Sequence, residues 1–116
     1  MKTRQQIFVF ASNLAGRHGA GSALEARKNH GAIYGRGVGH QGNSYAIPTK
    51  DMKLNPLPLN IIYEYVQGFI EFATKHPDME FNVVKIGCGL AGFEERKIKP
   101  LFKNAPENVN LPKGWR

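Results

Sequence analysis

Residues 7–31, "IFVFASNLAGRHGAGSALEARKNHG", are the stretch that indicates the fold most clearly. The first five residues form a short apolar run followed by polar turn residues, which is typical of a buried strand. A loop follows, and a helix is expected from about Ala20 to Asn29, with Gly31 beyond its end as a stop signal. The stretch therefore indicates a strand that passes through a glycine-rich loop into a helix.

The rest of the chain continues this alternation. The strongest helix is predicted over 58–75, where apolar residues recur at helical spacing between Pro58 and Pro77. A last helix is expected within 97–103, with Pro100 in its first turn or at a kink. Strands that alternate with helices predict one small α/β sandwich with a partly parallel sheet. The further expected strands are 32–35, 44–48 (ended by Pro48), 81–86 and, as an edge strand, 108–111.

The charge of the chain is positive and unevenly distributed. The net charge is +7, and residues 1–50 hold seven Lys or Arg against one acid, whereas 51–116 hold nine against eight. A basic half favours an anionic partner, which can be a nucleotide, a phosphorylated metabolite or nucleic acid. Because the positive residues are scattered singly, nucleic acid is not the first choice. The single cysteine excludes an internal disulfide, and we expect a cytoplasmic protein without a membrane partner, because no long apolar run or signal peptide is recognisable.

Glycine clusters occur at three places. Residues 37–42 match the dinucleotide pattern G-x-G-x-x-G, but a strand rather than a helix follows, so we expect only a loop between strands. Residues 16–26 lead into a helix, where free N–H groups can bind an anion; a tight turn with positive φ is the alternative. Residues 87–92 follow a strand at the end where ligands bind in open α/β sheets. The last two loops together suggest a clamp for a diphosphate.

Three segments together resemble the macro domain family: "IFVFASNLAGRHGAGSALEA" (7–26), "SYAIPTKD" (44–51) and "VVKIGCGLAGF" (83–93). They are most similar to the branch that includes terminal ADP-ribose glycohydrolases and ADP-ribose 1″-phosphate phosphatases. The resemblance implies a single domain over residues 1–116, a three-layer α/β/α sandwich with a mixed, partly parallel sheet. It also implies that ADP-ribose or a related nucleotide is the ligand.

The same resemblance implies a role for individual residues. Asn13 would reach the distal ribose, and Lys50 matches the lysine that acts as nucleophile in the glycohydrolases. Phe93 would pack near the distal ribose. In that branch an aspartate stands where this chain has Ala91, and the usual Gly-Asp-Ile/Leu segment that holds adenine is missing. Backbone contacts to the diphosphate would come from Gly19, Ala20 and Gly21 on one side and from Gly87, Cys88, Gly89, Leu90, Ala91 and Gly92 on the other.

The residues themselves leave several roles open. Cys88 would need a base to act as a nucleophile, and without a histidine near it in sequence a small buried residue is favoured. His18 can act as a general acid or bind phosphate, or it can be a solvent-facing loop residue. Lys50 can be a nucleophile, but without an acid at position 91 a cation that pairs with phosphate is favoured. Neither a metal site nor a cofactor is expected from the histidine and cysteine spacing.

Three functions follow in order. The first is hydrolysis of an ADP-ribose derivative, at the phosphoester or at the glycosidic or ester bond on the distal ribose. A water held near Asn13 would attack, and His18 or Lys50 would assist proton transfer or stabilise the developing charge. The second is a reader or sequestering module that uses the same cleft without turnover, as Ala91 favours. The third is a nucleic-acid-binding domain, which the basic half of the chain motivates.

Overall fold

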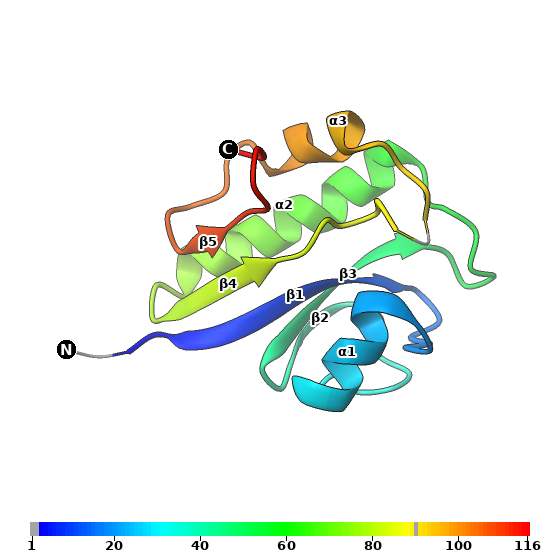
Figure 1. The fold of residues 1–116 in the computed structure, drawn as a ribbon, viewed down its shortest axis with the longest axis horizontal. Helices are drawn as coiled ribbons and strands as arrows, with labels where there is room; N and C mark the ends of the chain where they lie inside the picture. Colours follow the sequence, from blue (N-terminus) through cyan, green and yellow to red (C-terminus); the bar gives the residue numbers. More distant parts are fainter. Residues whose placement is uncertain (1–2, 90) are drawn as a thin grey trace.

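A five-stranded mixed sheet forms the centre of the molecule (Figure 1). The computed structural model describes residues 3–89 and 91–116. The strand order is β2-β3-β1-β4-β5, and all neighbours are parallel except β2, which pairs antiparallel with β3. The strands are β1 (Gln5–Asn13), β2 (Gly39–Gln41), β3 (Ser44–Lys50), β4 (Met79–Val83) and β5 (Val109–Asn110).

Helices cover both faces of this sheet, as Figure 1 shows. Helix α1 (Gly21–Asn29) lies on one face. Helix α2 (Leu59–Lys75) lies on the other, together with α3 (Glu95–Ile98) and the 3-10 helix η1 (Lys99–Phe102). The predicted three-layer α/β/α sandwich with a mixed, partly parallel sheet is therefore confirmed. Pro100 lies in the first turn of η1, where its missing N–H is tolerated.

The two faces of β1 build two different cores. Ile7 and Val9 face α2, and Phe10 faces α1, because successive strand residues point to opposite sides. The α2 side is the larger core, and complete burial of each large apolar side chain there contributes about 1.5–3 kcal/mol. The α1 side consists mostly of alanines packed around Phe10, and these small side chains let α1 lie close to the sheet. The helix side of the larger core is formed by Ile62, Val66, Phe69, Ile70 and Ala73.

Two predicted strand boundaries are wrong. The strand that we expected to end at Pro48 continues to Lys50. Pro48 has no N–H to donate to β1, but it pairs with Ser12 at the point where the register of the two strands shifts, so the strand tolerates it. The strand expected over 81–86 spans only 79–83, and Ile86 N–H turns back to Val84 O at 2.7 Å.

The segment 32–41 also differs from expectation. Residues 32–35 are not a strand, since Ala32 N–H donates to Ala26 O and Gly35 N–H donates to Gly16 O at 2.8 Å. These bonds tie the segment to α1 and to the loop after β1 instead of to a sheet. Gly39–Gln41 is the short strand β2, and the sequence G-x-G-x-x-G is followed by β3 rather than by a helix. The prediction that a strand rather than a helix follows this motif is confirmed, but the motif is not a loop throughout, because its residues 39–41 form β2.

The parallel pairing brings three strand ends to one edge of the sheet. Strands β3, β1 and β4 are neighbours and run in the same direction, so their carboxyl ends and the loops after them meet there. In Figure 1 these loops lie at the right-hand side of the molecule. Within residues 3–89 and 91–116, no helix is long and apolar enough to cross a bilayer.

We predict that Gly37→Ala destabilises the fold by about 2 to 4 kcal/mol, because a methyl group there has no room. It would overlap the carbonyl oxygen of Asn13 and lie 3.0 Å from the Asn13 carbonyl carbon and 3.2 Å from Leu14 Cα. The matched control is Gly68→Ala, in the middle of α2, where a methyl group would meet nothing within 4 Å. That control should stabilise the protein by about 0.5–1 kcal/mol, since alanine is the better helix former. Urea unfolding measures both, and equal midpoints for Gly37→Ala and wild type would contradict the prediction.

Candidate functional site

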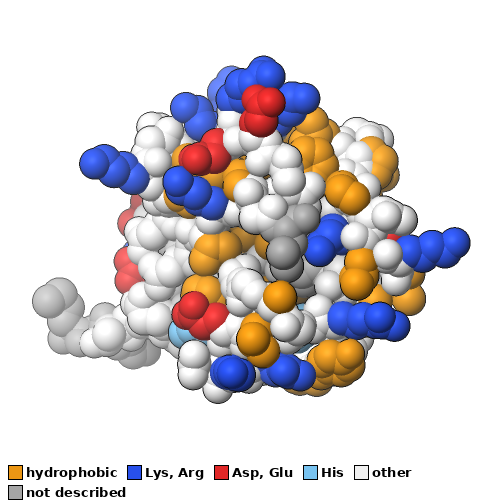
Figure 2. Space-filling model, turned by 45° about the vertical axis from the view of Figure 1, so that its right-hand side comes forward, with side chains coloured by type: hydrophobic (Ala, Val, Ile, Leu, Met, Phe, Trp, Pro, Cys, Tyr) orange, Lys and Arg blue, Asp and Glu red, His pale blue; other side chains and the backbone are white. Residues whose placement is uncertain are grey.

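A cleft of about 870 Å³ opens at the edge where β1, β3 and β4 end. Figure 2 turns this edge of the molecule toward the reader. The cleft is lined by the loop after β1, the start of α1, the end of β3 and the loop after β4. Nine of the thirteen predicted site residues line it: Asn13, Gly19, Ala20, Gly21, Lys50, Gly87, Cys88, Gly89 and Ala91.

The first wall of the cleft is the N-terminus of α1. The first N–H groups of a helix have no acceptor within the helix, and no side chain caps them here. Gly21, Ser22 and Ala23 all line the cleft. Gly21 has φ of 59°, so the tight turn with positive φ that was one reading of this loop is present. The same residues place uncapped N–H groups and the positive end of the helix dipole at the cleft, so the two readings of this loop are compatible.

Asn13 shapes the loop between β1 and α1. Its Oδ1 accepts the Arg17 N–H and its Nδ2 donates to Arg17 O, both at 2.9 Å. The side chain is 6% exposed and lines the cleft. An amide group has two donor hydrogens, so one Nδ2 hydrogen remains for a ligand. The two bonds also keep Arg17, an exposed cation, at the margin of the cleft.

The second wall is the glycine loop after β4. Gly87 has φ of 76°, and Phe93 N–H donates to Gly87 O at 2.9 Å, which closes the loop. Gly92 and Phe93 are outside the cleft lining, and Phe93 packs against the core on the α2 side. These two residues therefore support the loop rather than face the cleft. Leu90, which we predicted as a ligand contact, lies outside the described residues.

Lys50 lies at the last position of β3, half-buried, and lines the cleft. The neighbouring Asp51 turns into its own loop, where its Oδ1 accepts the N–H groups of Lys53 at 2.8 Å and Asn55 at 2.9 Å. The Asp51 carboxylate is therefore engaged by its own loop. Among the described residues, Lys50 forms no ion pair within 4.0 Å.

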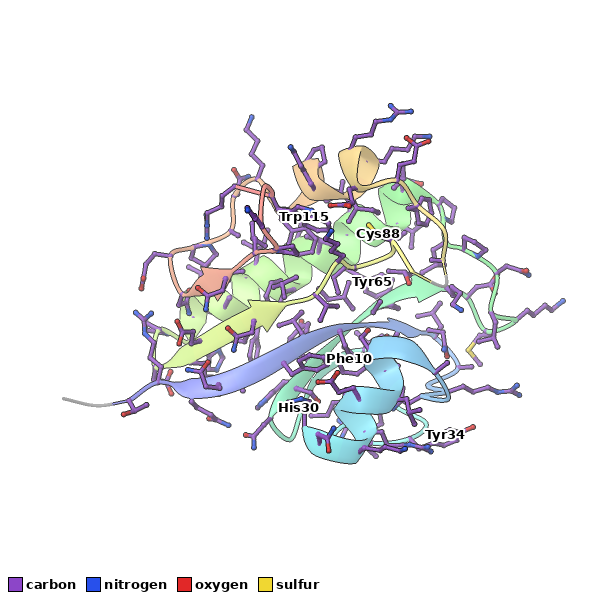
Figure 3. The ribbon with its side chains drawn as sticks, in the orientation of Figure 1. Phe10, His30, Tyr34, Tyr65, Cys88 and Trp115 are labelled. Carbon is purple, nitrogen blue, oxygen red and sulfur yellow. The ribbon has the colours of Figure 1, made fainter. Side chains whose placement is uncertain are left out.

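Two exposed apolar side chains line the cleft beside these polar groups. Tyr34 is 57% exposed and has the guanidinium of Arg27 5.6 Å from its ring centroid. Leu54 is 38% exposed and has φ of 67°, a left-handed conformation that costs a leucine free energy. Figure 3 shows Tyr34 on the α1 side of the sheet and Cys88 on the α2 side. Because both residues line the cleft, the cleft extends across the ends of the strands.

The structure does not bring His18 to the cleft. Its side chain is fully buried, edge-on to Phe10 with ring centroids 5.4 Å apart, and it is not among the lining residues. Neither ring nitrogen has a hydrogen-bond partner among the described residues. Burial lowers the pKa of His18; the nearby Arg36 backbone, which does not reach hydrogen-bond geometry, opposes that shift, and Arg27 adds to it. The solvent-facing alternative is therefore wrong, and the buried ring has no path to a ligand in this conformation.

The sequence interpretation missed three charged residues of the cleft, which are Arg17, Lys85 and Glu95. Lys85 Nζ and Glu95 Oε2 are 3.2 Å apart, and Trp115 Nε1 donates to Glu95 Oε1 at 2.9 Å. Both Lys85 and Glu95 line the cleft. Lys85 lies two residues before Gly87, so its closeness to the glycine loop was a usable signal. Glu95 and Trp115 are brought together only by tertiary packing, and nothing in their spacing indicates a shared site. Within the described part of the chain, no three His, Cys, Asp or Glu side chains gather as metal ligands.

Comparisons with known proteins identify the fold and nothing finer. No family model matches the chain, and no curated protein matches it. A solved structure of a Bacteroides thetaiotaomicron protein of unknown function is similar, with a TM-score of 0.64 at 17% identity over 90% of this chain and 82% of that one. A second crystal structure from the same organism has a TM-score of 0.58 at 18% identity over 90% of this chain and 84% of that one. At these identities the likeness supports a shared fold.

We predict that the Cys88 thiol reacts slowly with alkylating reagents at neutral pH. Burial raises its pKa, the negative charge of Glu95 raises it further, and Lys85 partly opposes both. A raised pKa keeps the thiol protonated at neutral pH, and the thiolate is the reactive form. The pH midpoint for alkylation by iodoacetamide should therefore lie above the value of about 8.5 for a free cysteine. A short peptide with one cysteine and blocked ends serves as the reference. Glu95→Gln should move the midpoint down, and a wild-type midpoint at or below the reference would show that the thiol is activated.

Proposed function

We propose that this protein binds ADP-ribose or a derivative in the cleft, with the diphosphate between the two backbone walls. The observation that supports this most is the pairing of the uncapped N-terminus of α1 with the glycine loop after β4 on one cleft. Backbone N–H groups of this kind bind phosphate without a metal. Three cations, Arg17, Lys50 and Lys85, line the same cleft and suit a ligand with two negative charges.

The size and the remaining lining suit a nucleotide rather than inorganic phosphate. Ligand pockets measure about 300–1,000 Å³, and this cleft of about 870 Å³ is in the upper part of that range. Tyr34 and Leu54 offer exposed apolar surface to a ring of the ligand, and aromatic side chains stack well on bases and sugars. Arg17 and Lys50 are two of the seven positive residues in the basic first half of the chain, and both line the cleft.

Hydrolysis of the bound ligand is the activity that we propose, at the phosphoester or at the glycosidic or ester bond of the distal ribose. A carboxylate, that of Glu95, lines the cleft although position 91 is an alanine. The second candidate is a reader or sequestering module without turnover, which is favoured by Ala91 and by the burial of His18. Incubation with ADP-ribose 1″-phosphate and with ester-linked ADP-ribosyl substrates separates the two, because a reader binds and releases them unchanged.

Filling the cleft at a glycine should weaken binding without unfolding the protein. A Cβ at Gly89 would meet nothing within 4 Å, so Gly89→Val adds its side chain to open space in the second wall. We expect the affinity for ADP-ribose, measured by isothermal titration calorimetry, to fall at least about tenfold, which is 1.4 kcal/mol. Gly68→Val is the matched control, an equally open glycine in α2 outside the cleft lining, and should keep the affinity. Unchanged affinity in Gly89→Val would place the ligand elsewhere.

Lys50 should contribute to binding through its charge. We expect Lys50→Gln to weaken ADP-ribose binding about tenfold and to reduce its salt dependence, because an exposed ion pair is screened by salt. Lys53→Gln is the control, since this exposed lysine in the adjacent loop does not line the cleft. Lys50→Arg keeps the charge, so it should restore binding and, if Lys50 acts as a cation, turnover as well. Loss of turnover in Lys50→Arg with intact binding would instead indicate a nucleophilic lysine.

A further inference from the structure

Glu95 has a distinctive position in the cleft. Among the described residues that line it, Glu95 has the only carboxylate, in the company of Arg17, Lys50 and Lys85. Its side chain is 47% exposed, so water and a ligand can reach it. A carboxylate in the lining of an anion-binding cleft repels a diphosphate, so binding of the ligand does not by itself explain why Glu95 lies there. Its location therefore calls for a chemical explanation.

We propose that Glu95 is the general base of this site and that Trp115 is its positioning residue. The inference rests on the proposed function, because it assigns a residue to hydrolysis of the bound ADP-ribose derivative. The carboxylate would take a proton from the water that attacks the ligand. The sequence analysis considered His18 or Lys50 for assistance and did not consider Glu95, and the macro domains that the chain resembles have an aspartate where this chain has Ala91.

The carboxylate is held from two sides. Trp115 Nε1 donates to Oε1 at 2.9 Å, and Lys85 Nζ lies 3.2 Å from Oε2. Trp115 is 5% exposed and packs against Phe102 with ring centroids 5.7 Å apart, so the core fixes the indole. Each carboxylate oxygen has two acceptor sites, so one on each oxygen remains for water. Figure 3 shows Trp115 and Cys88 on the same side of the sheet, where this wall of the cleft lies.

The same contacts set the protonation state. The hydrogen bond from Trp115 lowers the pKa of Glu95 most; the Lys85 hydrogen bond and the charges of Lys85 and Lys99 lower it further, and slight burial opposes them. Glu95 is therefore ionised at neutral pH, and it can accept a proton but has none to donate. Glu95 therefore cannot itself protonate a leaving group, so it suits a substrate whose leaving group departs as an anion.

An ester-linked ADP-ribosyl substrate meets that requirement. The water oxygen forms a bond to the anomeric carbon of the distal ribose while Glu95 takes one of the water's protons. The bond from that carbon to the ester oxygen breaks, and its electron pair leaves on the departing carboxylate. Glu95 then returns the proton to solvent. Neither a redox partner nor a metal is needed to balance this step.

The test compares Glu95→Gln with Glu94→Gln. Glu94 is an exposed neighbour that pairs with Arg96 and does not line the cleft, so it controls for the loss of a nearby charge. With an ester-linked ADP-ribosyl peptide, we expect Glu95→Gln to lower kcat at least about 100-fold. Its affinity for ADP-ribose should be equal to or tighter than that of wild type. Glu94→Gln should resemble wild type in both.

The pH profile distinguishes a base from a residue that only braces the loop. Wild-type kcat should fall at low pH as Glu95 becomes protonated, and the residual rate of Glu95→Gln should lack this fall. Trp115→Phe keeps an aromatic ring against Phe102 but removes the N–H, so the pKa of Glu95 rises and the fall in kcat moves to higher pH. A merely structural Trp115 would leave the midpoint unchanged.

The results distinguish failure of the role of Glu95 from failure of the proposed binding. Wild-type binding of ADP-ribose without hydrolysis of the ester, or equal kcat in Glu95→Gln and wild type, overturns the role of Glu95 and leaves the proposed binding intact. Absence of ADP-ribose binding by the wild type overturns both. Thermal unfolding of the variants verifies that the fold is kept, which we expect because the Glu95 side chain is half-exposed.

Discussion

The parallel pairing of β1 with β3 on one side and β4 on the other is the constraint on which the site depends. It aligns three strand ends, and with them Asn13, Lys50 and the loop that begins at Val84. Residues that are far apart in sequence thereby come together at one cleft. Helix α1 adds its N-terminus to the same edge because it follows β1 directly. Ligand binding at such an edge is the general rule for open α/β sheets.

Glycine has two separate uses at this edge. At Gly37 it lets two backbone segments touch, since any side chain there would collide with Asn13. At Gly19 and Gly89 it leaves open space in the walls of the cleft, where an added Cβ would meet nothing within 4 Å. The first use fixes the shape of the strand ends, and the second leaves room for a ligand. The pattern G-x-G-x-x-G belongs to the first use, although it looks more like a binding motif than the other two clusters.

The sequence predicted the layers, the long helix and most of the backbone of the cleft because these depend on local patterns. Hydrophobic periodicity identified α2, and glycines next to strand ends identified both walls. It did not predict that His18 is buried against Phe10 or that Trp115 reaches Glu95, because both depend on packing between distant segments. The predicted end of β3 at Pro48 was wrong, because a shift in the register with β1 accommodates the proline and no local sequence pattern reveals that shift. Charged side chains of the cleft were thus harder to predict than its backbone.

The central claim is that the two backbone walls hold a diphosphate, and an NMR titration with ADP-ribose tests it most directly. In ¹H–¹⁵N spectra, the amide signals of residues 21–23 and 87–89 should shift strongly and together, because their N–H groups would meet the phosphates. Signals from the end of α2 near Lys75, outside the cleft lining, should stay in place. Unchanged signals at both walls under saturating ADP-ribose, or shifts confined to other surfaces, would contradict the account.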